Sequence, residues 1–227
     1  MTTRAVPMAD VRDMYMAHTV FRREFGLMPE LVRGVAEGDT ARSEVVGAHL
    51  DLLCRILHSH HEGEDAIVWP RLQERGGREA AEIVPTMEGH HRAIEAILRR
   101  LGTLAPAWRA TARGGAQVAE ACEDLLVVLV EHMAMEEKEI LPLAEKYITA
   151  AEWKGLGEHG VNSFSKRELA LAFGLVMYEG DPEVVGQVLL EMPFPVRLLM
   201  PHIAPRAFAA HARRVHGTAV PPRAGRM

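Results

Sequence analysis

The sequence predicts an all-α protein: an up-down-up-down four-helix bundle over residues 1–150, followed by a C-terminal extension of shorter helices over residues 151–227. Two observations predict this fold. Apolar residues recur at spacings of three and four throughout the chain, whereas the alternation that is typical of strands never persists. Glycine pairs and prolines then divide the first part of the chain into four long segments with short connections, which is the pattern of a four-helix bundle.

Helix boundaries in the first half of the bundle follow from capping residues, glycines and a proline. A first helix is expected over about residues 8–36 and a second over about residues 40–75, where a glycine pair ends it. Because proline lacks a backbone donor and crowds the preceding turn, Pro70 predicts a kink or a short break in the second helix.

The second half of the bundle is divided in the same way. A third helix is expected to start near Pro85, because proline suits the first turn of a helix, and to continue past Leu101. Another glycine pair separates it from a fourth helix over about residues 116–147, which Pro142 interrupts.

After the fourth helix the pattern changes to shorter helices and frequent prolines. Ser165 and Glu168 form a capping box that opens one helix, and Asp181 caps another. Later prolines are expected to break the chain over residues 193–205 into short pieces. From about residue 217 a disordered tail is expected.

Composition excludes several classes of partner. The formal charge is -5, so neither nucleic acid nor an anionic membrane is expected as a partner. The apolar runs are too short to cross a bilayer, and the first residues contain no apolar signal core. Two cysteines cannot form a disulfide framework, which favours a cytoplasmic protein, and Cys54 and Cys122 are expected to be buried thiols. The oligomeric state does not follow from the sequence.

Two segments repeat the same order of histidine, glutamate and proline. His60 and His132 each lie ten residues before a proline, and each is followed four residues later by a glutamate, Glu64 or Glu136, and then by a second acid. Residues four apart lie on one face of a helix, which here is also the apolar face. A buried ionised glutamate costs several kcal/mol unless it is paired or bound to a metal. Two such faces therefore predict a metal site.

The other two bundle helices each place one histidine on the apolar face, His18 in the first and His91 in the third. A set of imidazoles and carboxylates in a bundle core suits iron or manganese, and the sequence leaves the choice between these two metals open. A cysteine-based zinc site is excluded because the cysteines are not clustered.

Together, these segments resemble the hemerythrin-like, or HHE cation-binding, domains. The run HSHHEGEDAIVWPRL, the later run HMAMEEKEILPLAE and the single helical histidines match the family in order over about residues 10–148. The resemblance implies a non-haem centre of two iron ions, bridged by carboxylates, that binds dioxygen, nitric oxide or peroxide. It implies six metal ligands: His18, His60, Glu64, His91, His132 and Glu136.

One position departs from the oxygen-carrying hemerythrins, which have a histidine pair spaced by four on the third helix. Here Met87 stands four residues before His91. The departure argues against reversible oxygen carriage and leaves a position that His90, His61 or water can fill. His61 has Asp65 four residues later, and we interpret these two residues as a surface ion pair.

Several other groups stay outside the predicted ligand set. Asp65 and Glu137 are alternative ligands, or hydrogen-bond acceptors for ligand imidazoles. His49 shares the face of His60 but lies three turns away, roughly 16 Å along the helix, which is too far for the same centre. The late histidines have no matching partners and are not expected to be ligands: His159, His202, His211 and His216.

The function that follows is a cytoplasmic di-iron protein that binds a small diatomic molecule or peroxide. The alternatives are a peroxide-decomposing (catalase-like) or nitric-oxide-reducing enzyme, and an iron-storage or sensing module. Because all of these use the same ligands, the sequence does not decide whether the protein is an enzyme. Open positions on the irons favour turnover, so peroxide decomposition is expected rather than oxygen storage.

Overall fold

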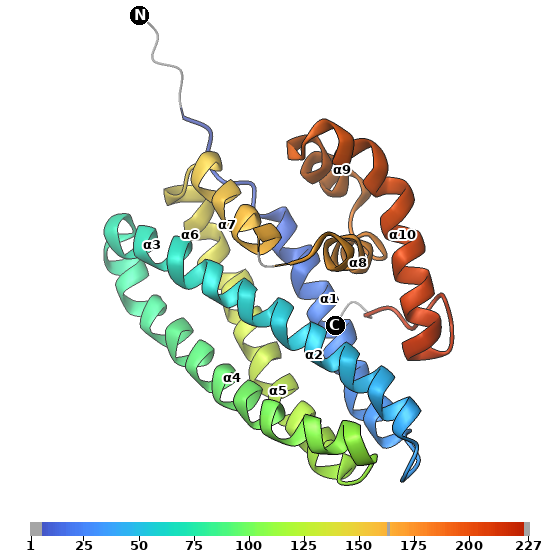
Figure 1. Cartoon of the computed structure of the whole chain (residues 1–227). Helices are drawn as coiled ribbons and strands as arrows, with labels where there is room; N and C mark the ends of the chain where they lie inside the picture. Colours follow the sequence, from blue (N-terminus) through green and yellow to red (C-terminus); the bar gives the residue numbers. More distant parts are fainter. Residues whose placement is uncertain (1–5, 163, 225–227) are drawn as a thin grey trace, which may run out of the picture.

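The computed structural model describes residues 6–162 and 164–224, and the regular elements in this part of the chain are helices apart from one isolated β-bridge. Each long helix of the bundle packs against the next along the chain, and the last returns to the first, so the predicted four-helix bundle is confirmed (Figure 1). Within the described residues, no helix combines the length and the apolar character needed to cross a membrane. The long helices are α1 (Arg12–Arg33), α2 (Thr40–Gly63), α4 (Gly77–Thr111) and α5 (Gly115–Met135).

Two π turns extend α2 and α5. In each turn the hydrogen bonding widens by one residue, so that the N–H of Trp69 donates to the carbonyl of Glu64, and the N–H of Leu141 to that of Glu136. A proline follows directly in both places, and it can neither donate a hydrogen bond nor fit closely against the carbonyl four residues earlier. The helix interruptions predicted at Pro70 and Pro142 therefore take the form of widened π turns. The elements are η1 (Glu64–Val68), α3 (Trp69–Arg75), η2 (Glu136–Ile140) and α6 (Leu141–Tyr147).

The third bundle helix begins earlier than predicted. α4 starts at Gly77, not near Pro85, and continues through Pro106. Both prolines lie on the exposed side of the helix, so water can bond the carbonyls that proline leaves without a donor. Gly77 itself has a φ of +54°, a left-handed conformation that glycine adopts without steric cost.

Two apolar cores fill the bundle, and a polar layer separates them. In each bundle helix the residues of one core precede the polar positions and those of the other core follow them. The predicted buried thiol is confirmed for Cys122, whereas Cys54 is only half-buried against the same core. The large core includes Phe21, Phe25, Leu57, Ile94 and Leu129, and the small core includes Met14, Trp69, Met87 and Ile140.

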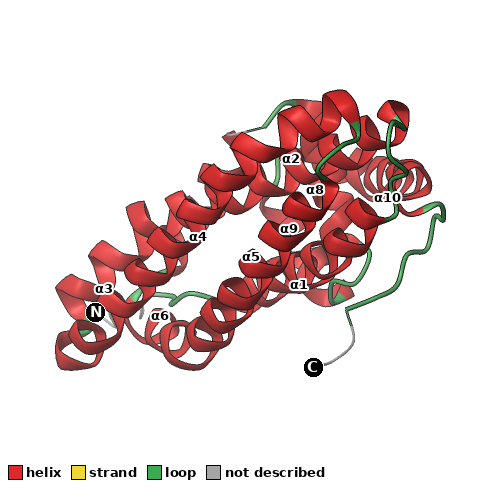
Figure 2. Ribbon diagram, turned by 90° about the horizontal axis from the view of Figure 1, so that it is seen from below, coloured by secondary structure: helices red, strands yellow, loops and turns green. Residues whose placement is uncertain are grey.

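The chain after α6 folds back along one side of the bundle (Figure 2). In this extension, α7 and α10 contact α2, whereas α8 and α9 contact α1. The capping box of Ser165 and Glu168 and the cap at Asp181 form as predicted. The elements of the extension are α7 (Ala150–Asn162), α8 (Lys166–Met177), α9 (Pro182–Glu191) and α10 (Phe194–His216).

α10 is one continuous helix, so the prediction that prolines divide this region into short pieces was wrong. Pro193 caps the helix and Pro195 lies in its first turn, where a backbone donor is not needed. Pro201 and Pro205 lie inside the helix, whose first half is largely exposed, so that water can bond the freed carbonyls.

Residues 217–224 form no helix but contact Tyr178, the residue that follows α8. The hydroxyl of Tyr178 donates a hydrogen bond of 2.7 Å to the carbonyl of Pro221, and the Arg223 guanidinium lies over the Tyr178 ring. This part of the expected tail is therefore held at Tyr178, and residues 225–227 lie outside the described residues. The division of the chain into a bundle domain and an extension stays a prediction.

Gly174 provides a test of the contact between α8 and α10. A Cβ at this position would lie 2.3 Å from the carbonyl oxygen of Ala204 and 2.8 Å from the Cβ of Phe208. We expect Gly174→Ala to push the two helices apart and to destabilise the extension by about 1–3 kcal/mol, measured by denaturant unfolding and by proteolysis of α10. The control Gly186→Ala, where a Cβ meets no atom within 4 Å, should be neutral or slightly stabilising. Equal effects of the two substitutions would contradict this packing.

Candidate metal centre

The polar layer between the two cores contains five histidines and two glutamates, and all four bundle helices contribute. The four residues His18, His132, Glu64 and Glu136 are fully buried, and His61 and His91 are less than one tenth exposed. All six ligands predicted from the sequence lie in this layer, and His61 joins them. The members are His18 from α1, His60 and His61 from α2, Glu64 from η1, His91 from α4, His132 from α5 and Glu136 from η2.

The ligand atoms of the layer form two groups. Within each group, one nitrogen or oxygen atom of every residue lies within 4.8 Å of the others, a spacing at which a single metal ion can contact all of them. We term them the three-histidine group, His61, Glu64, His91 and His132, and the two-histidine group, His18, His60 and Glu136.

Glu64 contacts imidazoles of both groups. Its Oε1 lies 3.0 Å from Nε2 of His60, and its Oε2 lies 3.2 Å from Nε2 of His91. The two oxygens of one carboxylate are thus directed to the two groups, which is the position of a bridging ligand.

Glu136 lies between the groups in a similar way. Its Oε2 lies 3.2 Å from Nε2 of His18 in the two-histidine group and 3.6 Å from Nε2 of His132 in the three-histidine group. The two π turns, η1 and η2, therefore each begin with a glutamate that faces both groups.

Several of the atoms that converge in the layer lie 3.0–3.6 Å apart as ion pairs, but none of them has a hydrogen bond of regular geometry. They are the buried Nε2 atoms of its five histidines and both carboxylate oxygens of its two glutamates. A buried polar atom left in this state costs about 1–3 kcal/mol, and charged groups cost more. A bound cation would satisfy all of these atoms together, so the residues of the layer fit a metal centre.

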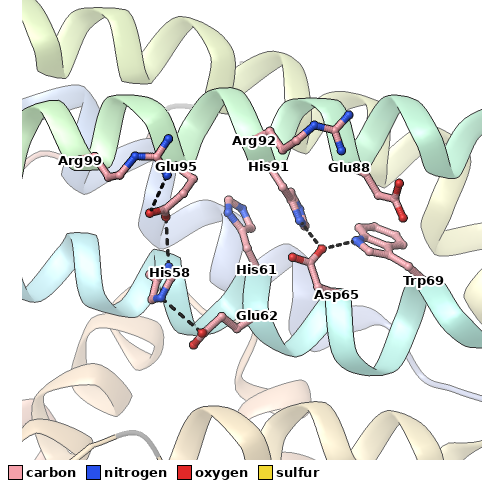
Figure 3. Close-up of a pocket in the computed structure, with 10 residues that line it drawn as sticks. All are labelled: His58, His61, Glu62, Asp65, Trp69, Glu88, His91, Arg92, Glu95 and Arg99. Atoms are coloured by element: carbon pink, nitrogen blue, oxygen red, sulfur yellow. Dashed lines mark hydrogen bonds and ion pairs between the residues drawn. The ribbon is translucent and has the colours of Figure 1, made fainter.

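Carboxylates outside the layer orient two of the imidazoles. Nδ1 of His91 donates to Asp65 over 2.8 Å, and Asp65 also accepts from the Trp69 indole over 2.7 Å (Figure 3). Likewise, Nδ1 of His18 donates to Glu137 over 2.8 Å. Of the two roles considered from the sequence, Asp65 and Glu137 thus take that of hydrogen-bond acceptors, which direct the opposite ring nitrogens to the centre.

His61 was wrongly interpreted as half of a surface ion pair. It is only 7% exposed, and its ring stacks on that of His91 with 4.1 Å between the centroids. Asp65, the expected partner, binds His91 instead. His60 and His61 diverge by about 100° on the helix, so each faces a different group of the layer.

Position 87, four residues before His91, differs from the oxygen-carrying hemerythrins because it is occupied by an apolar side chain. Met87 is fully buried in the small core. His61 therefore supplies a fifth imidazole from α2, whereas His90, whose ring centroid lies 6.1 Å from that of His132, belongs to neither group.

The protonation states of the imidazoles differ within the layer. Burial lowers the pKa of His61 and His132 well below the ordinary value, so both rings are neutral, as metal ligands must be. Burial also lowers the pKa of His18 and His91, but the carboxylates beside them outweigh it and raise each pKa to about 9. In the metal-free chain these two rings carry a proton at neutral pH.

Two cavities reach the layer from the surface. A polar cavity of about 700 Å³ between α2 and α4 opens onto His61 and His91 (Figure 3). An apolar cavity of about 260 Å³ between the bundle and the extension reaches His60. The walls of the apolar cavity include Phe21 and Ile56 from the bundle, and Trp153, Ala172 and Phe173 from the extension.

The fold and the polar layer define a helical-bundle protein with a cation-binding centre. The family described as hemerythrin HHE cation binding domain matches residues 9–144, a segment that covers more than half of the chain and contains the whole layer. The chain therefore belongs to the hemerythrin HHE cation-binding family. No curated protein and no solved structure matches the chain.

The contribution of His61 can be tested against its neighbour His58. We expect His61→Ala and His132→Ala each to lose most of the bound metal, because each removes an imidazole from the three-histidine group. His58 is about half exposed and bonds Glu95 at the edge of the polar cavity, so His58→Ala should keep its metal. The measurement is metal content by mass spectrometry on purified chains. Unchanged metal in His61→Ala would exclude His61 as a ligand.

Metal binding should depend steeply on pH. His18 and His91 have a pKa of about 9 in the metal-free chain, and each must lose its proton to bind a metal. Affinity for Fe(II) should therefore rise with pH between about 6 and 9, with release of about two protons per chain near neutral pH. Anaerobic calorimetry in buffers of different ionisation enthalpy measures this number. Binding without proton release would contradict the assigned protonation states.

Proposed function

We propose that the polar layer holds two non-haem iron ions, one in each group, bridged by Glu64 and Glu136. The observation that supports two ions is the position of these carboxylates, each of which contacts imidazoles of both groups. Imidazole and carboxylate donors suit iron or manganese, and the resemblance to the hemerythrins favours iron. Bound iron would supply a redox-active centre with positions open to a small ligand.

We further propose that a diatomic ligand, dioxygen or nitric oxide, binds on the side of the two-histidine group. Three imidazoles would fill more positions around one ion than two imidazoles would fill around the other, so the open side would lie at His18 and His60. The apolar cavity reaches His60 on this side. Its apolar walls suit a small uncharged gas and disfavour water and ions.

With His61 included, the layer offers five imidazoles, and this number favours a gas-binding protein more strongly than the sequence alone does. The doubt about reversible oxygen carriage rested on Met87, and His61 supplies an imidazole that compensates for it. Met87 and the rest of the small core cover one side of the layer and exclude water from it. Reversible binding needs one well-ligated ion beside a sheltered open one, and ions held by the two groups would have that asymmetry.

Peroxide decomposition is the second candidate, and the polar cavity favours it. The cavity opens onto His61 and His91 and carries both acidic and basic side chains, which suit a polar substrate such as hydrogen peroxide. The two candidates use the same irons but different cavities, so they can be separated experimentally.

Protein from iron-supplied cells should contain two iron ions per chain and absorb in the near ultraviolet when oxidised. After anaerobic reduction, stopped-flow mixing with dioxygen or nitric oxide should give a spectral change that reverses when the gas is removed. A single zinc ion, or no metal, would overturn the di-iron proposal. Rapid oxygen evolution from added peroxide without reversible gas binding would instead favour the enzyme.

The route of the gas can be tested at Ala172, which lines the apolar cavity on α8. Ala172→Phe should fill the cavity and slow gas binding by roughly tenfold, a barrier increase of about 1.4 kcal/mol, without loss of iron. The control Arg99→Ala changes the polar cavity and should leave the rate of gas binding unchanged. Equal rates in the two variants would exclude this route.

A further inference from the structure

A third group of potential metal ligands lies where the extension meets the bundle. Glu24 on α1, His49 on α2 and His216 in the last turn of α10 bring their ligand atoms within 4.8 Å of one another. The side chains of Glu24 and His49 are fully buried, and that of His216 is 5% exposed. From the sequence, His49 was expected to lie too far from His60 to belong to the same centre, and His216 was not expected to be a ligand.

Both imidazoles of this group approach the same carboxylate oxygen. Nε2 of His49 lies 3.0 Å and Nε2 of His216 lies 3.2 Å from Oε2 of Glu24. In a tetrahedral zinc site, bonds of about 2.0–2.1 Å place neighbouring ligand atoms about 3.3 Å apart. Each imidazole nitrogen is therefore already close to the spacing from the carboxylate oxygen that a zinc ion requires, and the three ligand atoms lie within 4.8 Å of one another.

Two of the ligands are oriented through their remaining polar atoms. Oε1 of Glu24 accepts a hydrogen bond of 2.7 Å from Nε of Arg23, and Nδ1 of His49 lies 3.0 Å from Nε2 of His211. Outer hydrogen bonds of this kind are typical around metal sites, and they orient imidazoles of the polar layer as well.

The buried charges around the group favour a cation. Arg23 is paired with the carboxylates of both Glu24 and Glu179, and the side chains of all three are nearly inaccessible to solvent. Two carboxylates thus face a single guanidinium at this place. Because excess negative charge is costly away from water, these surroundings favour a cation over an anion or a neutral ligand.

We propose that Glu24, His49 and His216 bind a single zinc ion that fastens the end of α10 to the bundle. Two imidazoles and one carboxylate are a donor set that zinc commonly uses, with water as a fourth ligand. The three ligands come from α1, α2 and α10, so the ion cross-links the extension to two bundle helices. The Arg42 guanidinium on α2 holds the same end of α10 by donating to two of its backbone carbonyls.

The test counts both metals in the full chain, purified from cells supplied with iron and zinc. We expect one zinc ion per chain in addition to the metal of the polar layer. His216→Ala should lose this zinc and keep its iron, whereas His132→Ala should lose iron and keep the zinc. His202 is exposed on the same helix as His216, so His202→Ala should keep both metals.

A second measurement uses the unaltered chain and does not depend on the folding of a variant. Removing zinc with a chelator should increase hydrogen exchange in the last turn of α10, and added zinc should restore protection. Cobalt(II) in place of zinc should give the visible absorption of a tetrahedral site. If a chain purified without zinc gains neither the absorption on adding cobalt(II) nor the protection on adding zinc, the group is only a hydrogen-bonded network. Equal zinc content in the wild type and in His216→Ala would lead to the same conclusion.

Discussion

Between its two apolar cores the bundle holds two glutamates and five histidines at one level, and both glutamates and four of the histidines are buried. Transferring a carboxylate from water to such a place costs several kcal/mol unless it is paired or bound to a cation. The cost fixes the axial position of every helix, because each must present its ligand at this level and its apolar residues on either side. The ring of four helices, the two π turns and the outer carboxylates Asp65 and Glu137 all serve this arrangement.

The sequence was sufficient to predict the bundle and most residues of the polar layer, because both follow from the periodicity of residues within single helices. His132 and Glu136 share the phase of their apolar neighbours, and so do His18 and His91. His61 could not be found in this way. Two adjacent groups need ligands in two directions from α2, whereas periodicity identifies only the direction of the main apolar face. Because Asp65 follows His61 by four residues, the sequence instead suggested an ion pair between them on the helix surface, which was wrong.

Other features depend on contacts that a single segment does not reveal. Whether a proline ends a helix depends on whether the carbonyl it leaves unbonded faces water, which is why the start of α4 and the continuity of α10 were mispredicted. The group of Glu24, His49 and His216 forms only because the extension folds back onto α1 and α2. The apolar cavity has the same origin, since α7 and α8 supply one of its walls. The extension thus shapes the access to a centre to which none of its described residues contributes a ligand.

The π turns also constrain how the gene can change length. Each turn holds one residue more than an α-helical turn, so it absorbs that residue and leaves α3 and α6 in the orientation that a regular helix one residue shorter would give them. Deleting one of residues 65–68 would therefore restore regular hydrogen bonding and still leave Trp69 and Leu72 facing the small core. Deleting one residue from the regular part of α2 would instead turn everything beyond it by about 100° relative to what precedes it. Sequences descended from this chain should therefore tolerate a one-residue deletion in these turns better than one in the α-helical turns beside them.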